Sequence, residues 1–125
     1  MEKKLEGKVA WVTGSSRGLG RGIAAHLAEL GASVVVHGTS PTSTRAFDEA
    51  DSLEAVAAEI AEQSGSPTMA VWGDLTDADR VQTVVGEIRA RFGQIDILVN
   101  CAGIGTLAHS HEMPFEQWQR ILGVN

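Results

Sequence analysis

The sequence predicts an α/β fold in which a parallel sheet of about four strands carries helices on both faces. Three observations predict it. Short runs rich in β-branched residues alternate with helical patterns along the chain. A cluster of glycines joins the first such run to the first helical pattern. Glycine or polar residues close each β-branched run. Strand–helix–strand units of this length cross over with a right hand and make their strands parallel.

The expected strands are "KVAWVTG" (8–14), "ASVVVHGTS" (32–40), "SPTMAVWGD" (66–74) and "QIDILVNCAG" (94–103). Their apolar residues are typical of strands that are covered on both faces. Parallel strands place their carboxyl ends on one edge of the sheet, where ligands bind. The residues at these ends are Gly14, Thr39, Asp74 and Asn100. This pattern is that of a Rossmann-like, doubly wound sheet, here incomplete, and residues 1–125 form one domain.

Apolar residues at helical spacing predict helices over 19–30, 53–65, 76–93 and 113–125, with a loop over 40–52. Thr76 and Asp79 have the spacing of a capping box at the start of the third helix. The residues that this spacing gathers on one face of each helix are Leu19, Ile23, Leu27 and Leu30; Leu53, Val56 and Ile60; Val81, Val84, Val85, Ile88 and Phe92; and Phe115, Trp118 and Leu122.

Composition narrows the class of protein. A net charge of −6 and a pI near 5.1 disfavour nucleic acid as a partner, because backbone binding needs clustered Lys and Arg. The sequence has neither an 18-residue apolar run nor a signal peptide, so we expect a cytoplasmic protein with no membrane partner. Cys101 is the single cysteine and is expected to be a small buried residue. His26 and His37 are expected to be surface or packing residues. No metal site is expected, the best candidate being His109 with His111.

The glycine-rich stretch "VTGSSRGLGRGIA" (12–24) is the strongest functional signal. Glycine costs stability in regular structure, so a cluster of it indicates a close backbone approach or a positive φ. The first turn of a helix has unpaired N–H groups and a partial positive charge, which together bind phosphate. We therefore expect a phosphorylated ligand. A Gly-x-x-x-x-Gly-Lys motif is missing, which disfavours a phosphate-loop nucleotidase.

The same stretch carries a resemblance to a known family. The spacing Gly-x-x-x-Gly-x-Gly in "TGSSRGLG" resembles the short-chain dehydrogenase/reductase family. Three more motifs of that family follow in order: "GDLTD" (73–77), "NCAG" (100–103) and "GVN" (123–125). The resemblance covers essentially the whole chain. The stretches "VNCAG" and "EIRARFGQIDILVN" are most similar to 3-oxoacyl-carrier-protein reductases and related carbonyl reductases.

The resemblance implies a role for each matching residue. Asp74 would meet the adenine amino group, with Leu75 beside the ring. Asn125 would be catalytic and would hold a water of the proton relay through its main chain. Two narrower interpretations stay open: Asp74 only caps the next helix, or Asn100 only braces the sheet. The implied coenzyme-binding residues are Gly14, Ser16, Arg17, Gly18, Leu19, Gly20, Thr39, Ser40, Asp74, Leu75, Asn100, Ala102 and Gly103.

The end of the second strand predicts which coenzyme binds. NAD-specific sheets commonly place an acidic residue there to hold the ribose 2′-hydroxyl, whereas a 2′-phosphate needs positive charge or hydroxyl donors. This chain offers His37, Thr39 and Ser40, and no acid before Asp48. Arg17 in the glycine turn can donate to the same phosphate. The sequence therefore predicts NADP(H) over NAD(H).

One departure from the family bears on activity. The family uses a serine and a Tyr-x-x-x-Lys pair, and this sequence contains no tyrosine. The resemblance thus implies the coenzyme-binding front half of an NAD(P)-dependent oxidoreductase, truncated after Asn125, whose complete parent acts on a carbonyl or alcohol and forms a homo-oligomer. Two alternatives stay open. One is a non-catalytic nucleotide-binding module, and the other is an interaction protein that uses the uncovered edge of the fourth strand.

Overall fold

A computed structural model of the chain describes residues 2–42, 52–103 and 112–125. Its sheet contains β1 (Val9–Thr13), β2 (Ser33–Gly38), β3 (Thr68–Trp72) and β4 (Ile97–Asn100). All four strands are parallel and lie in the order β3-β2-β1-β4, so β4 lies at an edge of the described sheet. The expected Rossmann-like α/β fold is confirmed.

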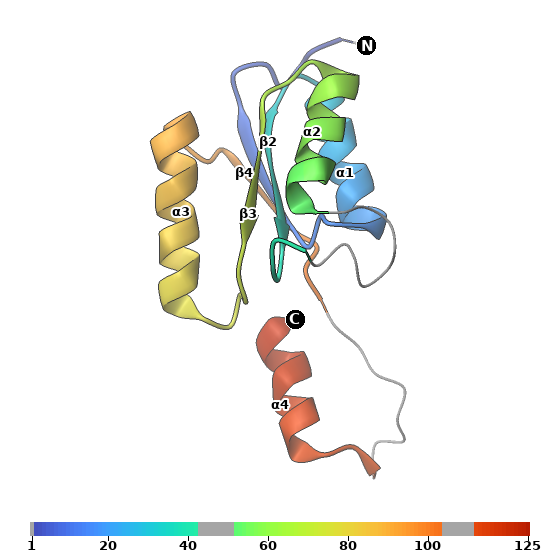
Figure 1. Cartoon of the computed structure of the whole chain (residues 1–125), viewed down its shortest axis with the longest axis vertical. Helices are drawn as coiled ribbons and strands as arrows, with labels where there is room; N and C mark the ends of the chain where they lie inside the picture. Colours follow the sequence, from blue (N-terminus) through green and yellow to red (C-terminus); the bar gives the residue numbers. More distant parts are fainter. Residues whose placement is uncertain (1, 43–51, 104–111) are drawn as a thin grey trace.

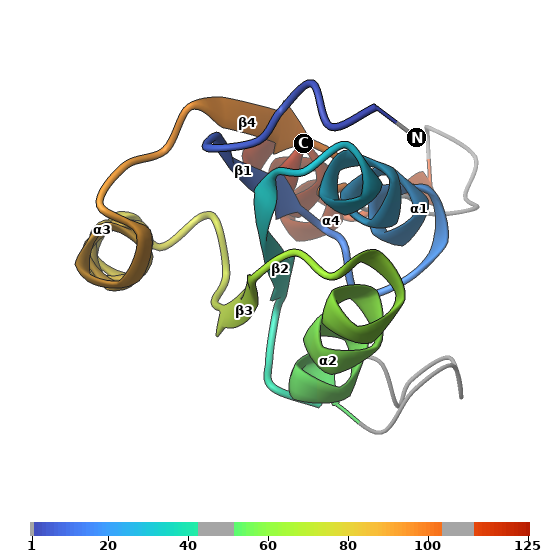
Figure 2. The same cartoon turned by 90° about the horizontal axis from the view of Figure 1, so that it is seen from above.

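Helices cover both faces of the sheet (Figures 1 and 2). α1 (Gly18–Glu29) and α2 (Leu53–Ser64) pack on one face, against alternate strand residues such as Val12 and Val36. α3 (Ala78–Phe92) packs on the other face through Val84 and Ile88. α4 (Phe115–Val124) lies beyond the carboxyl ends of the strands (Figure 1).

The face of α1 that packs on the sheet is the predicted one only in part, since Ile23 and Leu27 pack against the core as expected. Leu19 is 79% exposed, so its expected place in the core was wrong. The buried residues are small ones, Gly20, Ala24 and Ala28. A Cβ on Gly20 would lie only 2.2 Å from the carbonyl oxygen of Gly14. Small side chains therefore let the start of α1 lie almost in contact with the turn that precedes it.

Caps decide where α2 and α3 begin. The Ser52 hydroxyl accepts a hydrogen bond from the Ala55 N–H (3.1 Å) at the start of α2. The capping box predicted for Thr76 was wrong, because the cap of α3 is Asp77, which accepts from the Arg80 N–H (3.1 Å). The Thr76 hydroxyl instead donates to Asp74 (2.7 Å), so it is not available to the helix.

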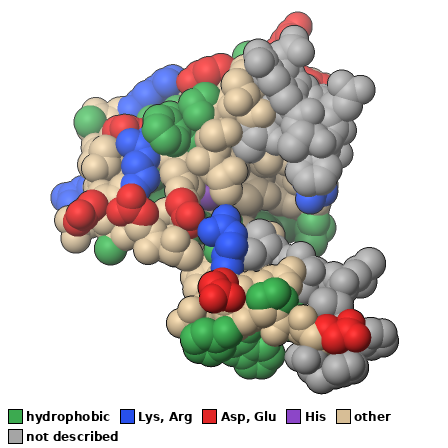
Figure 3. Space-filling model, turned by 60° about the horizontal axis from the view of Figure 1, so that its bottom comes forward, with side chains coloured by type: hydrophobic (Ala, Val, Ile, Leu, Met, Phe, Trp, Pro, Cys, Tyr) green, Lys and Arg blue, Asp and Glu red, His purple; other side chains and the backbone are tan. Residues whose placement is uncertain are grey.

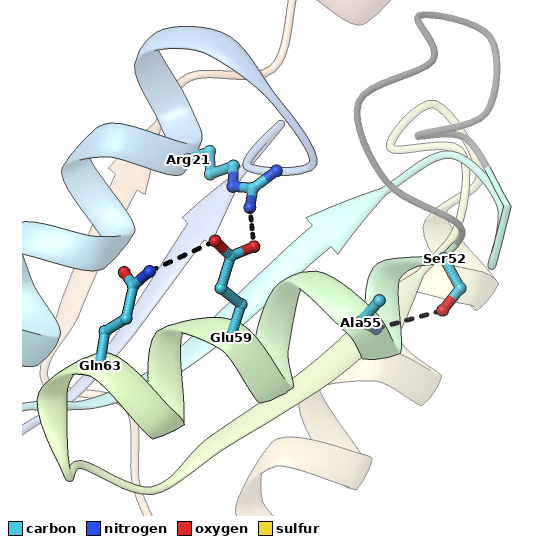
Figure 4. Close-up of polar contacts among 5 residues, drawn as sticks. All are labelled: Arg21, Ser52, Ala55, Glu59 and Gln63. Carbon is cyan, nitrogen blue, oxygen red and sulfur yellow. Dashed lines mark hydrogen bonds and ion pairs between the residues drawn. The ribbon is translucent and has the colours of Figure 1, made fainter.

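An ion pair joins α1 to α2 on the face that they share. Arg21, in the first turn of α1, donates to the carboxylate of Glu59 in α2 (Figure 4). Gln63, one turn further along α2, donates to the other oxygen of Glu59 at 3.3 Å. The pair is partly exposed, so it adds little to stability and mainly helps to orient α1 and α2 relative to each other.

Large apolar side chains are exposed on α4 and β4. Phe115, Trp118 and Leu122 of α4 are 66%, 52% and 62% exposed, and Leu98 of β4 is 54% exposed. Figure 3 shows hydrophobic side chains gathered on α4. No helix in the described ranges is long and apolar enough to span a membrane. The loop expected over 40–52 lies mostly outside those ranges, as do His109 and His111.

Candidate functional site

A cleft of about 630 Å³ opens at the carboxyl ends of the strands. Every residue predicted to bind coenzyme lines it, with the exception of Asn100. The cleft therefore brings together predicted residues that lie far apart in sequence, from Gly14 to Gly103. It also contains lining residues that the sequence analysis did not single out for binding: Gly38, Thr42, Gly73, Cys101, Arg120 and Val124.

The glycine turn calls for glycine at Gly14 and Gly18, for two different reasons. Gly14 has φ +60°, and a Cβ there would lie 2.6 Å from the Cα of Ala102. Gly18 has φ +59° with open space around it, so its backbone conformation rather than its surroundings calls for glycine. The turn thus presents main-chain atoms to the cleft while its back lies against the chain that follows β4.

The start of α1 supplies main-chain hydrogen-bond donors to the cleft. Arg17 occupies the cap position, and its side chain makes no capping hydrogen bond to the helix. The first-turn N–H groups of Gly18, Leu19 and Gly20 cannot find partners within the helix, and these residues line the cleft. The first turn also holds no acidic residue. This end of the cleft is therefore suited to an anion.

Thr13, the last residue of β1, is a residue that sequence reasoning missed. Its hydroxyl donates to the Val99 carbonyl (3.4 Å) and accepts from the N–H groups of Cys101 (3.1 Å) and Ala102 (3.2 Å). These bonds hold the chain after β4 against the glycine turn. The only signal was a polar residue at the end of an apolar strand, directly before Gly14.

Asp74 lies on the opposite side of the cleft, just after β3. Its Oδ1 accepts from the N–H of Thr76 (2.9 Å) and from the Thr76 hydroxyl (2.7 Å). Arg120 of α4 lies 3.7 Å from its Oδ2. The hydrogen bonds from Thr76, assisted by Arg120, lower the pKa of Asp74. Because Asp77 caps α3, the interpretation of Asp74 as only a helix cap was wrong.

The two asparagines differ in their surroundings. Asn125 follows α4, and its side-chain oxygen would lie 2.6 Å from a Cβ placed on Gly103. The end of α4 is therefore close to the "NCAG" segment. Asn100 is exposed at the end of β4, opposite Thr13 in the sheet. The side-chain hydrogen bonds that join this end of β4 to β1 are made by the Thr13 hydroxyl.

The remaining single residues behave as packing or surface groups. His37 is only 2% exposed, and both ring nitrogens form hydrogen bonds, to the Gly14 N–H (3.0 Å) and the Gly73 carbonyl (2.9 Å). Its predicted contribution to phosphate binding was therefore wrong. His26 is exposed beside Glu29. Cys101 is half-buried and packs against the core under α1 and α2, so it is less buried than expected.

A parallel sheet, a tight glycine turn and an uncapped helix start that open into one cleft define a nucleotide-binding α/β protein. The family model of short chain dehydrogenases matches residues 8–125, and the chain belongs to this family.

Relatives of the chain are reductases and dehydrogenases. A 3-oxoacyl-[acyl-carrier-protein] reductase of Aquifex aeolicus is 39% identical over 125 residues, which is 100% of this chain and 47% of the relative. Glucose 1-dehydrogenase 2 of Bacillus subtilis is 36% identical over 126 residues, again all of this chain and 45% of the relative. This chain thus spans less than half the length of these relatives.

Solved structures agree with the fold. L-Sorbose reductase from Gluconobacter frateurii, complexed with NADPH and L-sorbose, superimposes with a TM-score of 0.84 at 34% identity. The alignment covers 99% of this chain and 44% of that one. A short chain dehydrogenase from Burkholderia cenocepacia in complex with NADP gives a TM-score of 0.81 at 36% identity, covering 97% of this chain and 46% of the other.

Proposed function

We propose that the chain is the coenzyme-binding part of an NADP(H)-dependent oxidoreductase that interconverts a carbonyl and an alcohol. The observation that carries this proposal is the uncapped start of α1, which opens into the cleft directly beside the packed glycine turn. Two structurally similar family members hold NADPH or NADP, which supports the same coenzyme here. When bound, the nicotinamide supplies or accepts the hydride.

In this proposal, different groups of residues in the chain contact different parts of the coenzyme. The N–H groups at the start of α1, with Ser16, bind the pyrophosphate. Asp74 and Leu75 contact the adenine, because Asp74 is ionised and lies opposite the glycine turn. Asn100, Ala102 and Gly103 lie on the adenosine side. Asn125, beside Gly103, approaches the reacting end and holds the relay water through its main chain.

Arg17, Thr39 and Ser40 are proposed to select NADP(H). All three line the cleft, and Arg17 is exposed at the cap of α1. The burial of His37 leaves Arg17 and Arg120 as the positive charges among the described residues that line the cleft, and Arg17 belongs to the glycine turn. Hydroxyl groups and a guanidinium suit a dianionic phosphate, whereas none of the described cleft residues directly after β2, Thr39, Ser40 and Thr42, is an acid that would hold a ribose diol.

Removal of Arg17 tests this preference. In Arg17→Ala we expect the affinity for NADPH to fall by about tenfold or more, the effect of losing a charge-assisted hydrogen bond, and the affinity for NADH to change little. Isothermal titration calorimetry on the purified chain measures both. Arg89→Ala removes an equal charge at the far end of α3 and is the control. Equal affinities for the two coenzymes in wild type and Arg17→Ala would contradict NADP(H) selection.

The substrate class and the cellular compartment are part of the same proposal. The complete protein is proposed to be a cytoplasmic carbonyl reductase similar to 3-oxoacyl-carrier-protein reductases. The identity with the Aquifex aeolicus reductase supports this, as does the stretch "VNCAG".

Self-association is a second proposal, favoured by the exposed apolar residues of α4 and β4. Exposed aromatic and aliphatic side chains favour burial against a second copy. Sedimentation velocity is expected to show a concentration-dependent dimer, and the double variant Trp118→Gln, Leu122→Gln is expected to weaken it by about tenfold or more. Trp118 and Leu122 are both exposed, so the variant is expected to fold, and wild-type-like thermal melting confirms it. A monomer at every concentration would contradict self-association.

A further inference from the structure

His37 lies at a junction of three strand ends. It is the penultimate residue of β2, and its ring is buried between the ends of β1 and β3. Nδ1 lies 3.0 Å from the nitrogen of Gly14, the residue that follows β1. Nε2 lies 2.9 Å from the carbonyl oxygen of Gly73, which follows β3. The ring therefore connects the phosphate side of the cleft to the adenine side.

The two partners determine the protonation state of the ring. The Gly14 N–H can only donate, so Nδ1 must accept and carries no proton. The Gly73 carbonyl can only accept, so Nε2 must carry the proton. Only the neutral tautomer protonated at Nε2 satisfies both bonds. A proton added to Nδ1 would face the Gly14 N–H and break that hydrogen bond.

Main-chain bonds strengthen the connection between His37 and the turn. The Ser15 N–H donates to the His37 carbonyl (2.9 Å), and the His37 N–H donates to the Ser15 hydroxyl (2.9 Å). The Ser15 hydroxyl donates in turn to the Val12 carbonyl (2.7 Å). Gly14 and Ser15 are thus held by His37 on one side, while Gly14 is packed against Ala102 on the other.

We propose that His37 is a positioning residue for coenzyme binding, which in its neutral form fixes Gly14 and the Gly73–Asp74 segment in the arrangement that the coenzyme needs. The inference rests on the proposed function, since it concerns the same cleft. Protonation of His37 breaks the hydrogen bond to Gly14 and so loosens the phosphate turn, while the bonds between Ser15 and the His37 main chain remain.

Burial decides the direction of the pH effect. Desolvation lowers the pKa of His37, and the bond to Gly73 opposes this only in part. Trp11 of β1 faces the ring edge-on and carries no charge. The charged groups nearest on the neighbouring elements are Asp74, directly after Gly73, and Arg80 of α3, whose side chain lies against Gly73. Arg17 and Arg120 line the same cleft.

The lowered pKa of His37 determines how the stability of the fold changes with pH. Above the ordinary pKa of 6.5, His37 is neutral in the folded and the unfolded chain. Below that value the unfolded chain takes up the proton first, so stability falls as the pH drops from 6.5 through the folded pKa. Coenzyme affinity falls over the lower part of the same range, because only the folded chain with neutral His37 binds.

Two substitutions of His37 test the roles of its two ring nitrogens separately. His37→Asn places a carbonyl oxygen near the position of Nδ1 and keeps an acceptor for Gly14. His37→Gln places an amide nitrogen near the position of Nε2 and keeps a donor for Gly73, but it loses the acceptor for Gly14. The side chains are similar in polarity, so each variant is the matched control of the other. Circular dichroism confirms that both are folded.

NADPH binding is measured by calorimetry at about pH 7.5 and about pH 5.5, on either side of the usual histidine pKa. We expect wild type to bind NADPH more weakly at the lower pH, but by less than about tenfold, because the lowered pKa of His37 leaves part of it neutral there. At the higher pH, His37→Gln is expected to bind about tenfold or more weakly than wild type, the effect of losing one buried hydrogen bond. His37→Asn is expected to bind NADPH more tightly than His37→Gln, because it keeps the acceptor for Gly14, and to lose most of the pH dependence. The 2′-phosphate titrates in the same range, but equally for all three proteins.

Nitrogen NMR of the wild-type chain without coenzyme tests the geometry directly. We expect neutral His37 to be protonated at Nε2 alone, with a titration midpoint below 6.5 that the Gly14 amide signal follows. Protonation at Nδ1, or NADPH affinities that are equal in the Asn and Gln variants, would overturn the inference. If the expected tautomer is present but wild type binds no NADPH at about pH 7.5, where histidine is neutral, the proposed function is the part that fails.

Discussion

Gly20→Ala is expected to lower the free energy of unfolding by about 1–3 kcal/mol, the usual cost of overpacking a tightly packed site. The added Cβ would lie 2.2 Å from the carbonyl oxygen of Gly14 and 2.9 Å from its carbonyl carbon. Both atoms belong to backbone, which cannot rotate out of the way as a flexible side chain can. Gly14 is itself packed against Ala102, so relaxation must displace the whole phosphate turn. Urea denaturation measures the loss, and NADPH affinity is expected to fall with it.

Gly22→Ala is the matched control in the same helix. A Cβ at Gly22 meets no atom within 4 Å, and the position is exposed. Alanine is a better helix former than glycine, so this variant is expected to gain up to about 1 kcal/mol. Equal urea midpoints for Gly20→Ala and Gly22→Ala would contradict the close packing of α1 on the turn.

The purified chain of 125 residues is expected to reduce no carbonyl substrate, even under conditions in which it binds NADPH. Hydride transfer to a carbonyl needs a proton donor at hydrogen-bond distance from the oxygen, and loss of such a group costs about 10²–10⁴-fold in rate. The sequence contains no tyrosine, the residue that donates this proton in the family that the chain resembles. The lost rate is therefore expected to leave no measurable turnover.

Loss of NADPH absorbance with a 3-oxoacyl thioester measures this turnover. A full-length relative, the Aquifex aeolicus reductase, is the positive control for turnover. NADPH binding by the chain is measured separately, and Asp74→Ala is expected to weaken that binding. NADPH-dependent reduction by the purified chain would contradict the expectation. The reading frame beyond Asn125 separates the remaining alternatives. We expect it to continue into a serine and a Tyr-x-x-x-Lys helix, whereas a stop codon there would favour a non-catalytic nucleotide-binding module.

Local features were predictable from the sequence because they depend on neighbours in the chain. The order of strands and helices follows from side-chain periodicity, and Gly65 and Gly93 end α2 and α3 in the left-handed conformation that glycine favours. The glycine turn was predictable for the same reason, since its motif spans one strand end and one helix start. Carboxyl ends of parallel strands meet at one edge, so the site could be placed there as well.

The limits of sequence reasoning appear where a side chain meets a residue distant in the chain. His37 looked like a polar group at a strand end, and only the approach of β1 and β3 shows that both its nitrogens are engaged. The role of Thr13 could not be predicted for the same reason, because its hydrogen-bond partners are 86 to 89 residues away in sequence. Leu19 fitted the apolar spacing of α1, but the close approach of Gly20 to Gly14 turns Leu19 outward.

The sequence by itself determined the fold class, the element order and the motif that opens the cleft, since periodicity, glycine and caps act within a few residues. The tertiary structure alone decided which side chains complete the site: Thr13 joins β1 to the chain after β4, His37 joins β1 to β3, and Arg120 pairs with Asp74. The physical reason is that hydrogen bonds and ion pairs require distances of a few ångströms, and such distances between remote residues exist only once the sheet has assembled.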